Sequence, residues 1–137
     1  MRHLQHLAMP AVMIAILLYS ITASQAATSF SDEQICKAGI ATLMGRSPTI
    51  IKTTGKEGNV VFFHYVRPTD GSKWSYRCKV EGIRIIWASD TGRWRTHSDD
   101  ERITYRASGD TLEIIQTFTD GSSVNKQFTR QQLGGIK

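Results

Sequence analysis

The hydrophobic residues of this chain follow two periods, one typical of a helix and a later one typical of strands. Between Cys36 and Met44, apolar residues recur at three- and four-residue intervals and so share one helix face. Ser31-Asp32-Glu33-Gln34 has the form of a capping box, and Gly45 followed by Pro48 gives a stop signal. The pattern predicts a helix after Ser31 with Cys36 directed at the core.

After Pro48 the segment TIIKTTGKEG has no clear period, and we interpret it as irregular. Beyond it, apolar and polar residues alternate in short runs that are separated by turns containing Gly or Asp. The expected strands are 59–66, 73–80, 83–88, 92–96, 101–107, 111–118 and 123–129. Since parallel crossovers need a dozen or more residues, these short connections predict an antiparallel meander.

The strand alternation also predicts which side chains face the core. A two-residue loop at Glu81-Gly82 would set Cys78 opposite Ile85 and Tyr76 opposite Trp87. The inward set is then Tyr76, Cys78, Val80, Ile83, Ile85 and Trp87, and the outward cations are Lys73, Arg77, Lys79 and Arg84. A slip by one residue would bury the arginines, which argues against it.

Two later hairpins are treated in the same way. A turn at Gly109-Asp110 sets Tyr105 opposite Ile114. For the last hairpin, a two-residue loop would set Phe118 against Ser123, whereas a three-residue loop, 120–122, sets Phe118 against Val124. We expect the longer loop, because it pairs apolar residues.

The cysteines suggest how the helix joins the sheet. Cys36 and Cys78 are the only two, and exported proteins mature where disulfides form. Closing a loop of this length stabilises a fold by about 4 kcal/mol in the chain-entropy model. The sequence therefore predicts an α+β fold, with an N-terminal helix packed on a curled antiparallel β-meander of about 6–7 strands that forms a partial barrel, and one disulfide.

The export argument comes from the N-terminus. A basic start, MRHLQHLAMP, precedes the apolar run AVMIAILLYSI, which has the length of a signal-peptide h-region and is too short to span a bilayer. Ser24-Gln25-Ala26 supplies small residues for cleavage, so residues 1–26 are expected to be a cleavable signal peptide and residues 27–137 a single exported domain. We expect a periplasmic or secreted protein with no membrane span after signal removal.

The net charge of the chain indicates which class of partner it would bind. Only Arg2 lies before the expected cleavage site, which leaves 16 basic against 12 acidic residues in the mature chain. This excess favours anionic partners, namely an envelope component such as lipid headgroups or acidic glycans, or an acidic protein. Nucleic acid would be an unusual partner for an exported chain.

The candidate binding residues cluster between positions 73 and 95, which include all three tryptophans. They are Arg77, Lys79, Arg84, Arg93, Trp94 and Arg95. Arginine suits bidentate contact with phosphate or carboxylate, and aromatic rings beside guanidinium groups suit stacking. The alternative is that these cations only solvate the sheet and protect its edges. Exposure of Trp94 would favour binding.

Chemistry-bearing residues elsewhere give weaker signals. His97 with Asp99 or Asp100 could form the centre of a small hydrolase, but their clustering is sequential and reads better as a solvated turn. His64 alternates with apolar residues, and the mature chain has too few histidines for a zinc site. No phosphate loop or dinucleotide motif occurs, so we expect no metal and no cofactor.

The leading interpretation is a non-catalytic binding or accessory protein that engages an anionic envelope component or partner protein. An exported small β-meander with one disulfide also resembles the periplasmic lysozyme inhibitors in layout, although no motif of that family is found here. That resemblance implies the alternative, an inhibitor that blocks a hydrolase cleft with a protruding hairpin such as Pro68 to Lys73.

Overall fold

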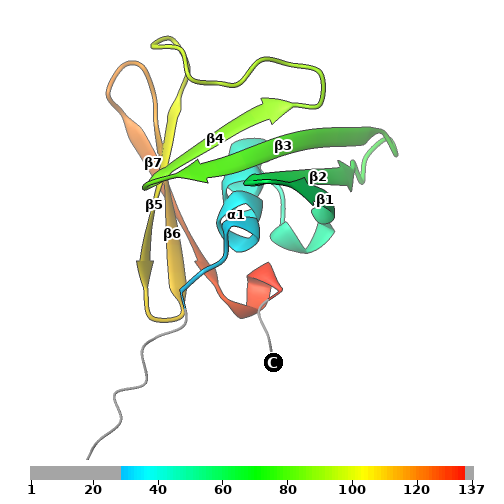
Figure 1. Cartoon of the computed structure of the whole chain (residues 1–137), viewed down its shortest axis with the longest axis horizontal. Helices are drawn as coiled ribbons and strands as arrows, with labels where there is room; N and C mark the ends of the chain where they lie inside the picture. The colour runs from blue at the N-terminus through cyan, green and yellow to red at the C-terminus, as the bar shows by residue number, and fades with distance from the viewer. Residues whose placement is uncertain (1–28, 135–137) are drawn as a thin grey trace, which may run out of the picture.

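The computed structural model describes residues 29–134, and the expected signal peptide, residues 1–26, lies outside them. One helix precedes seven strands, with a short 3-10 helix after α1 and another after β7 (Figure 1). The elements are α1 (Asp32–Met44), η1 (Pro48–Ile50), β1 (Lys52–Glu57), β2 (Val60–Val66), β3 (Lys73–Glu81), β4 (Arg84–Ser89), β5 (Arg102–Ser108), β6 (Thr111–Thr117), β7 (Ser123–Thr129) and η2 (Gln131–Leu133).

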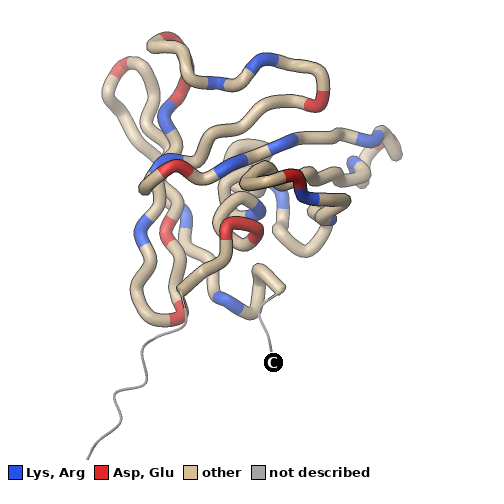
Figure 2. The backbone as a smooth tube through the Cα atoms, viewed as in Figure 1, with Lys and Arg blue, Asp and Glu red and all other residues tan. Residues whose placement is uncertain are grey.

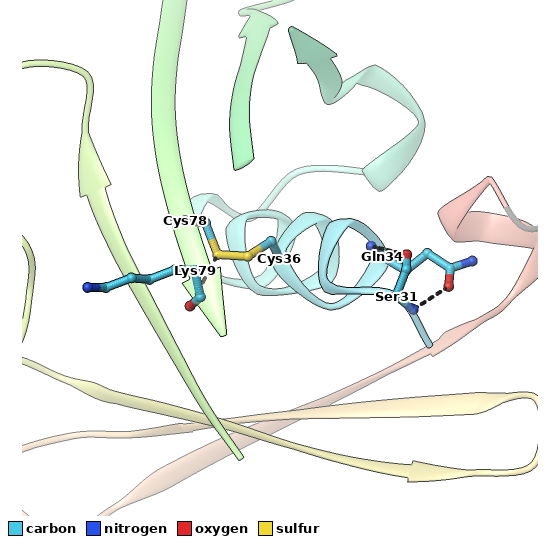
Figure 3. The surroundings of a disulfide bond; sticks show 5 residues. All are labelled: Ser31, Gln34, Cys36, Cys78 and Lys79. Carbon is cyan, nitrogen blue, oxygen red and sulfur yellow. Dashed lines mark hydrogen bonds between the residues drawn. A yellow bond between two sulfur atoms is a disulfide. The ribbon is translucent and has the colours of Figure 1, made fainter. Parts of the chain in front are cut away.

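The start and stop signals predicted for the helix are both present in the structure. The Ser31 hydroxyl accepts a hydrogen bond from the Gln34 backbone amide, and the Gln34 side chain accepts one from the Ser31 amide (Figure 3). Gly45 ends the helix with φ at 61°, a left-handed conformation that favours glycine. The helix is therefore fixed at both ends by the residues that the sequence indicates.

The sheet is an antiparallel meander in which the strands lie in chain order, β1 to β7. It curls around α1, which contacts β2, β3, β4 and β6, and it does not close into a barrel (Figure 1). The expected α+β architecture is confirmed. Only two pairs, Arg84 with Thr104 and Ile85 with Ile103, join β4 to β5, so the sheet opens beyond them.

The disulfide lies where the helix meets the sheet. Cys36 in α1 and Cys78 in β3 are bonded, their Cα atoms are 5.8 Å apart, and both side chains are fully buried. The next residue on β3, Lys79, extends away from the helix (Figure 3). The prediction that Cys78 looks inward while its cationic neighbours look outward is confirmed.

Two expectations about strands are wrong. The segment taken as irregular contains β1, whose six residues are all exposed, so it carries no alternation that a sequence pattern could show. The expected strand 92–96 is instead part of the loop 90–101, which makes two backbone bonds to β4, from the Gly92 amide to the Ser89 carbonyl at 3.1 Å and from the Arg95 amide to the Trp87 carbonyl at 2.9 Å.

The β3–β4 register differs from the prediction by two residues. Glu81 pairs with Arg84, so the loop is Gly82-Ile83, and Cys78 lies opposite Trp87. Gly82 has φ of 58°, a left-handed conformation that glycine adopts readily. In the loop 82–83 glycine takes the first position, so Glu81 does not have to adopt this conformation. A shift of two keeps every residue on its predicted face, but Ile83 leaves the core and is 65% exposed in the turn.

The later hairpins are predicted with mixed success. Tyr105 pairs with Ile114, as the Gly109-Asp110 turn predicts. In the last hairpin Thr117 pairs with Ser123, and the Phe118 amide donates to the Ser122 carbonyl. The loop has the expected three residues but is 119–121 rather than 120–122, so the expected pairing of Phe118 with Val124 is wrong.

Candidate binding surface

Six cations on β3, β4 and β5 have outward register on the convex side of the sheet, away from α1. Two of them are Lys73 and Arg106, of which Arg106 pairs with Glu113, and the other four form the candidate surface. Arg77 and Lys79 come from β3, Arg84 from β4 and Arg102 from β5, and we call this set the outer basic face. Figure 2 shows Lys and Arg following one another along β3. Pair register places Arg84 beside Thr104, so Arg102, two positions earlier on β5, lies diagonal to Arg84.

Trp94 folds back over this face from the loop 90–101. Its ring centre lies 4.7 Å from the Arg77 guanidinium and 4.7 Å from the Lys79 ammonium. Arg77 also donates to the Gly92 carbonyl, which holds the loop against β3. Ile86 and Ala88 have outward register on β4 yet are 3% and 0% exposed, and their cross-strand partners Lys79 and Arg77 both contact the Trp94 ring, from which we infer that the half-buried Trp94 covers them.

Arg93 and Arg95 do not join the outer basic face. The Arg93 guanidinium binds both carboxylate oxygens of Asp100, at 2.6 and 2.8 Å, and the His97 amide donates to the same carboxylate. Arg95 lies over the ring of Trp87, 5.3 Å from its centre, and 3.7 Å from Asp100. These bonds, the one from Arg93 foremost, hold the pKa of Asp100 well below its usual range.

The structure therefore divides the candidate residues into two groups. Arg77, Lys79, Arg84 and Trp94 lie together on the convex side, whereas Arg93 and Arg95 fasten the loop 90–101. Arg102 belongs with the first group and was missed. It lies outside the tryptophan-rich stretch, and only the pairing of β4 with β5 brings it close.

A second cluster of aromatic and cationic side chains lies on the concave side, past the end of α1. Tyr65 stacks on Tyr76 at 6.0 Å between ring centres, and Tyr76 contacts Trp87 at 6.1 Å. The Arg46 guanidinium lies 5.6 Å from the centre of the Tyr65 ring, and Arg67 lies 4.4 Å from the centre of Trp74. Burial, and then the Tyr65 hydroxyl, raise the pKa of Tyr76 above its ordinary value.

A pocket of about 270 Å³ opens where β4 and β5 separate, lined by Trp87, Arg95, Asp99, Asp100 and Glu101. Its carboxylates already have partners: Glu101 accepts from the Gln116 side chain, and Asp99 lies 3.4 Å from His97. Neither His97 nor Asp99 contacts a hydroxyl nucleophile in the hydrogen bonds of residues 29–134. The geometry therefore adds no support to a His97-centred hydrolase.

The remaining titratable residues are dispersed. No group of three or more His, Cys, Asp or Glu within residues 29–134 has a geometry that could hold a metal ion. His64 is half-buried on the outer side of β2, opposite Ser75 and Lys52, whereas the core residues of that strand are Val61, Phe63 and Tyr65.

Comparison with known proteins adds no relative: no protein-family model, no curated protein and no solved structure matches this chain. Within the described part of the chain, no helix has both the length and the apolar character needed to cross a membrane.

Proposed function

We propose that this protein is a non-catalytic binding or accessory protein whose outer basic face, with Trp94 at its centre, engages an anionic component of the cell envelope or an acidic partner protein. The observation that carries this proposal is that three of the four cations on that face have no ion-pair partner in the part of the chain that the structure describes. Within residues 29–134, Arg77, Arg84 and Arg102 have no carboxylate within ion-pair distance. Lys79 pairs with Glu81 at 3.2 Å.

The arrangement of these cations suits an extended anionic surface rather than a small ligand. They lie on neighbouring strands of one sheet face, and none of them lines the pocket where β4 and β5 separate. Guanidinium groups on a rigid sheet can bind phosphate, sulfate or carboxylate groups in a bidentate manner. Such contacts steer association and weaken as salt rises.

The test is binding of the mature domain to vesicles of anionic phospholipid, at low and at high salt. Arg84→Glu/Arg102→Glu should abolish the binding that wild type shows at low salt. The matched control is Lys56→Glu/Lys126→Glu, which makes the same change of charge on β1 and β7, where both side chains are exposed. Equal binding by wild type and the Arg84/Arg102 variant would refute the proposal.

A second candidate function, inhibition of a hydrolase, is favoured by the β2–β3 hairpin. Its tip is held by its own hydrogen bonds: the Arg67 amide donates to the Ser72 carbonyl at 2.8 Å, and Asp70 accepts from the Ser72 amide and hydroxyl. The indole of Trp74 donates to the Ser72 hydroxyl at 2.8 Å, although Trp74 is 41% exposed. A rigid loop with an exposed aromatic residue loses little entropy on binding a cleft.

The two candidate functions predict different effects of salt concentration and of the Trp74→Ala substitution. Inhibition through the hairpin should be stoichiometric, persist at high salt and be lost in Trp74→Ala. Binding through the outer basic face should weaken with salt and be unaffected by Trp74→Ala. A panel of envelope-active glycoside hydrolases and peptidases, assayed with both variants, separates these outcomes.

A further inference from the structure

We propose that the concave end of the sheet holds a second binding site, formed by Arg46, Arg67 and Trp74, which binds a carboxylated sugar residue of an acidic glycan. This site lies on the face opposite the outer basic face and uses none of its residues. The inference is therefore independent of binding through the outer basic face, and it shares Trp74 with the hairpin proposed for inhibition.

The site is built from two elements that the fold brings together. Arg46 directly follows the Gly45 cap of α1, and its amide is held by the Ala41 carbonyl at 2.9 Å. Arg67 directly follows β2, two positions after Tyr65, over whose ring Arg46 lies. Tyr65, under the Arg46 guanidinium, pairs with Trp74, under the Arg67 guanidinium, so the two cations lie over neighbouring rings.

Arg46 is the residue that most needs an explanation. Its guanidinium lies over the Tyr65 ring and, within residues 29–134, makes no hydrogen bond and no ion pair. Its Nε atom is shielded and has no partner, so its outer nitrogen atoms are the donors that a ligand can reach. A guanidinium held in place by an aromatic ring is preorganised for a bidentate contact with a carboxylate.

Arg67 and Trp74 supply the rest of the recognition surface. Arg67 is held over the indole at 4.4 Å and by Asp70 at 3.3 Å, and its side chain is 29% exposed. Trp74 lies beside Tyr65 in the β2–β3 pairing and is 41% exposed. The C–H face of a sugar ring buries apolar area against such an indole and meets the negative face of its π-system.

The chemistry of the surrounding groups favours an acidic sugar over a bare anion or an apolar ligand. The hairpin beside Trp74 carries the side chains of Asp70 and Ser72, which can exchange hydrogen bonds with sugar hydroxyls. A charged group at Arg46 and a ring on Trp74 together match a uronic-acid unit.

The test is calorimetric titration of the mature domain with tri-galacturonate. Two comparison ligands separate the parts of the proposal: the neutral trisaccharide of galactose has the rings without the carboxylates, and inorganic sulfate has the charge without a ring. We expect measurable binding of tri-galacturonate, at least tenfold weaker binding of the neutral trisaccharide, and no competition by sulfate at equal concentration.

Variants then assign the site. Arg46→Met removes the charge but keeps a long apolar side chain over Tyr65, and Trp74→Ala removes the indole; each should weaken binding of tri-galacturonate by roughly tenfold or more, the effect of losing one good contact. Arg84→Met/Arg102→Met on the outer basic face should leave the affinity unchanged.

Three results would overturn the proposal: equal affinity of Arg46→Met and wild type, equal binding of the neutral trisaccharide, or displacement by sulfate at the concentration of the sugar. Thermal unfolding and near-ultraviolet circular dichroism of each variant show whether it keeps the fold. If Arg46→Met is unfolded, Arg46→Lys, which keeps the charge and loses the planar fork, replaces it. Equal affinity of Arg46→Lys and wild type for tri-galacturonate would then overturn the proposal.

Discussion

At the scale of single residues, arginine over an aromatic ring is the recurring contact of this protein. Arg46, Arg67, Arg77 and Arg95 each lie between 4.4 and 5.6 Å from a ring centre, and the Nε atom of each is shielded without a partner among residues 29–134. Such contacts stabilise by about 0.5–1 kcal/mol each at exposed sites. The planar guanidinium groups thus cover rings that would otherwise meet water.

Trp94 and Trp74 provide a direct comparison of a tryptophan that covers the sheet with one that projects from it. Trp94→Ala should destabilise the fold by about 2 kcal/mol, because it uncovers Ile86 and Ala88 and leaves Arg77 without its ring. Trp74→Ala should cost less than about 1 kcal/mol, since its side chain is already 41% exposed.

Urea unfolding followed by circular dichroism measures both free energies. Similar losses in the two variants would show that Trp94 is not the cover of β4 that the structure indicates.

At the scale of elements, the loop 90–101 is fastened by one carboxylate rather than by strand pairing. The Asp100 carboxylate accepts hydrogen bonds from Arg93 and from the His97 amide and lies near Arg95. It therefore joins the beginning of the loop to its end. Gly92 makes the tight return possible, because a Cβ atom there would collide with the Ser89 side chain. The loop is therefore an ordered part of the molecule.

This attachment gives a prediction for acid. The pKa of Asp100 is lowered in the folded protein, so the stabilisation that its charge provides is present above the ordinary carboxyl pKa of about 3.9 and is lost only as pH falls through the lower folded value. Amide hydrogen exchange in residues 90–101 should therefore show the same protection at neutral pH and near pH 4, after correction for intrinsic rates.

Asp100→Asn should lose protection in this loop at neutral pH, whereas Asp99→Asn, with a side chain that is 91% exposed, should not. Loss of protection in wild type at a pH well above the ordinary carboxyl pKa would contradict the role given to Asp100.

At the scale of the whole molecule, the sheet has two parts that share one helix. The strands β1–β4 and β5–β7 are each continuously paired, and two residue pairs connect them. The helix packs on members of both parts, and its disulfide fixes it to β3. The apolar layer that α1 forms with the sheet therefore compensates for the short connection.

Removing the disulfide tests this arrangement. Cys36→Ala/Cys78→Ala should lower the free energy of unfolding by about 4 kcal/mol, the value expected for a closed loop of this length. Because both sulfurs are fully buried, a reductant such as dithiothreitol should reduce the wild-type bond no faster than the protein unfolds. Guanidinium unfolding, and reduction rates at several denaturant concentrations, measure the two effects.

An unchanged unfolding midpoint in the double variant, or reduction that is fast and independent of denaturant, would show that the bridge does not hold helix to sheet.

Much of this fold could be predicted from sequence because local signals agree with burial. The capping box at Ser31, the stop at Gly45 and the inward direction of Cys78 follow from periodicity and turn chemistry. The exposed β1 has no periodicity to detect. The predicted register of β3 against β4 was wrong because two possible hairpin loops, 81–82 and 82–83, both contain Gly82 and place the same residues on each face of the sheet. Only the backbone conformation of Glu81 and Gly82 distinguishes the two loops.

The candidate site was harder to predict, because its groups come from distant segments. Arg102 reaches the outer basic face through β4–β5 pairing, and Arg46 reaches the Tyr65 ring only because α1 packs on β2. Arg93 and Arg95 have the composition of a binding motif, yet Asp100 takes them into the loop. No spacing rule relates these residues, so only the packed structure could bring them together or separate them.

The position of the sulfur bridge also bears on how the chain matures. Both of its thiols, at positions 36 and 78, precede every residue of β4 to β7 in the chain. A polypeptide that emerges amino end first thus presents both partners while its later strands are still to come. The disulfide can form early, and the last four strands can then add one after another to a helix that is already anchored.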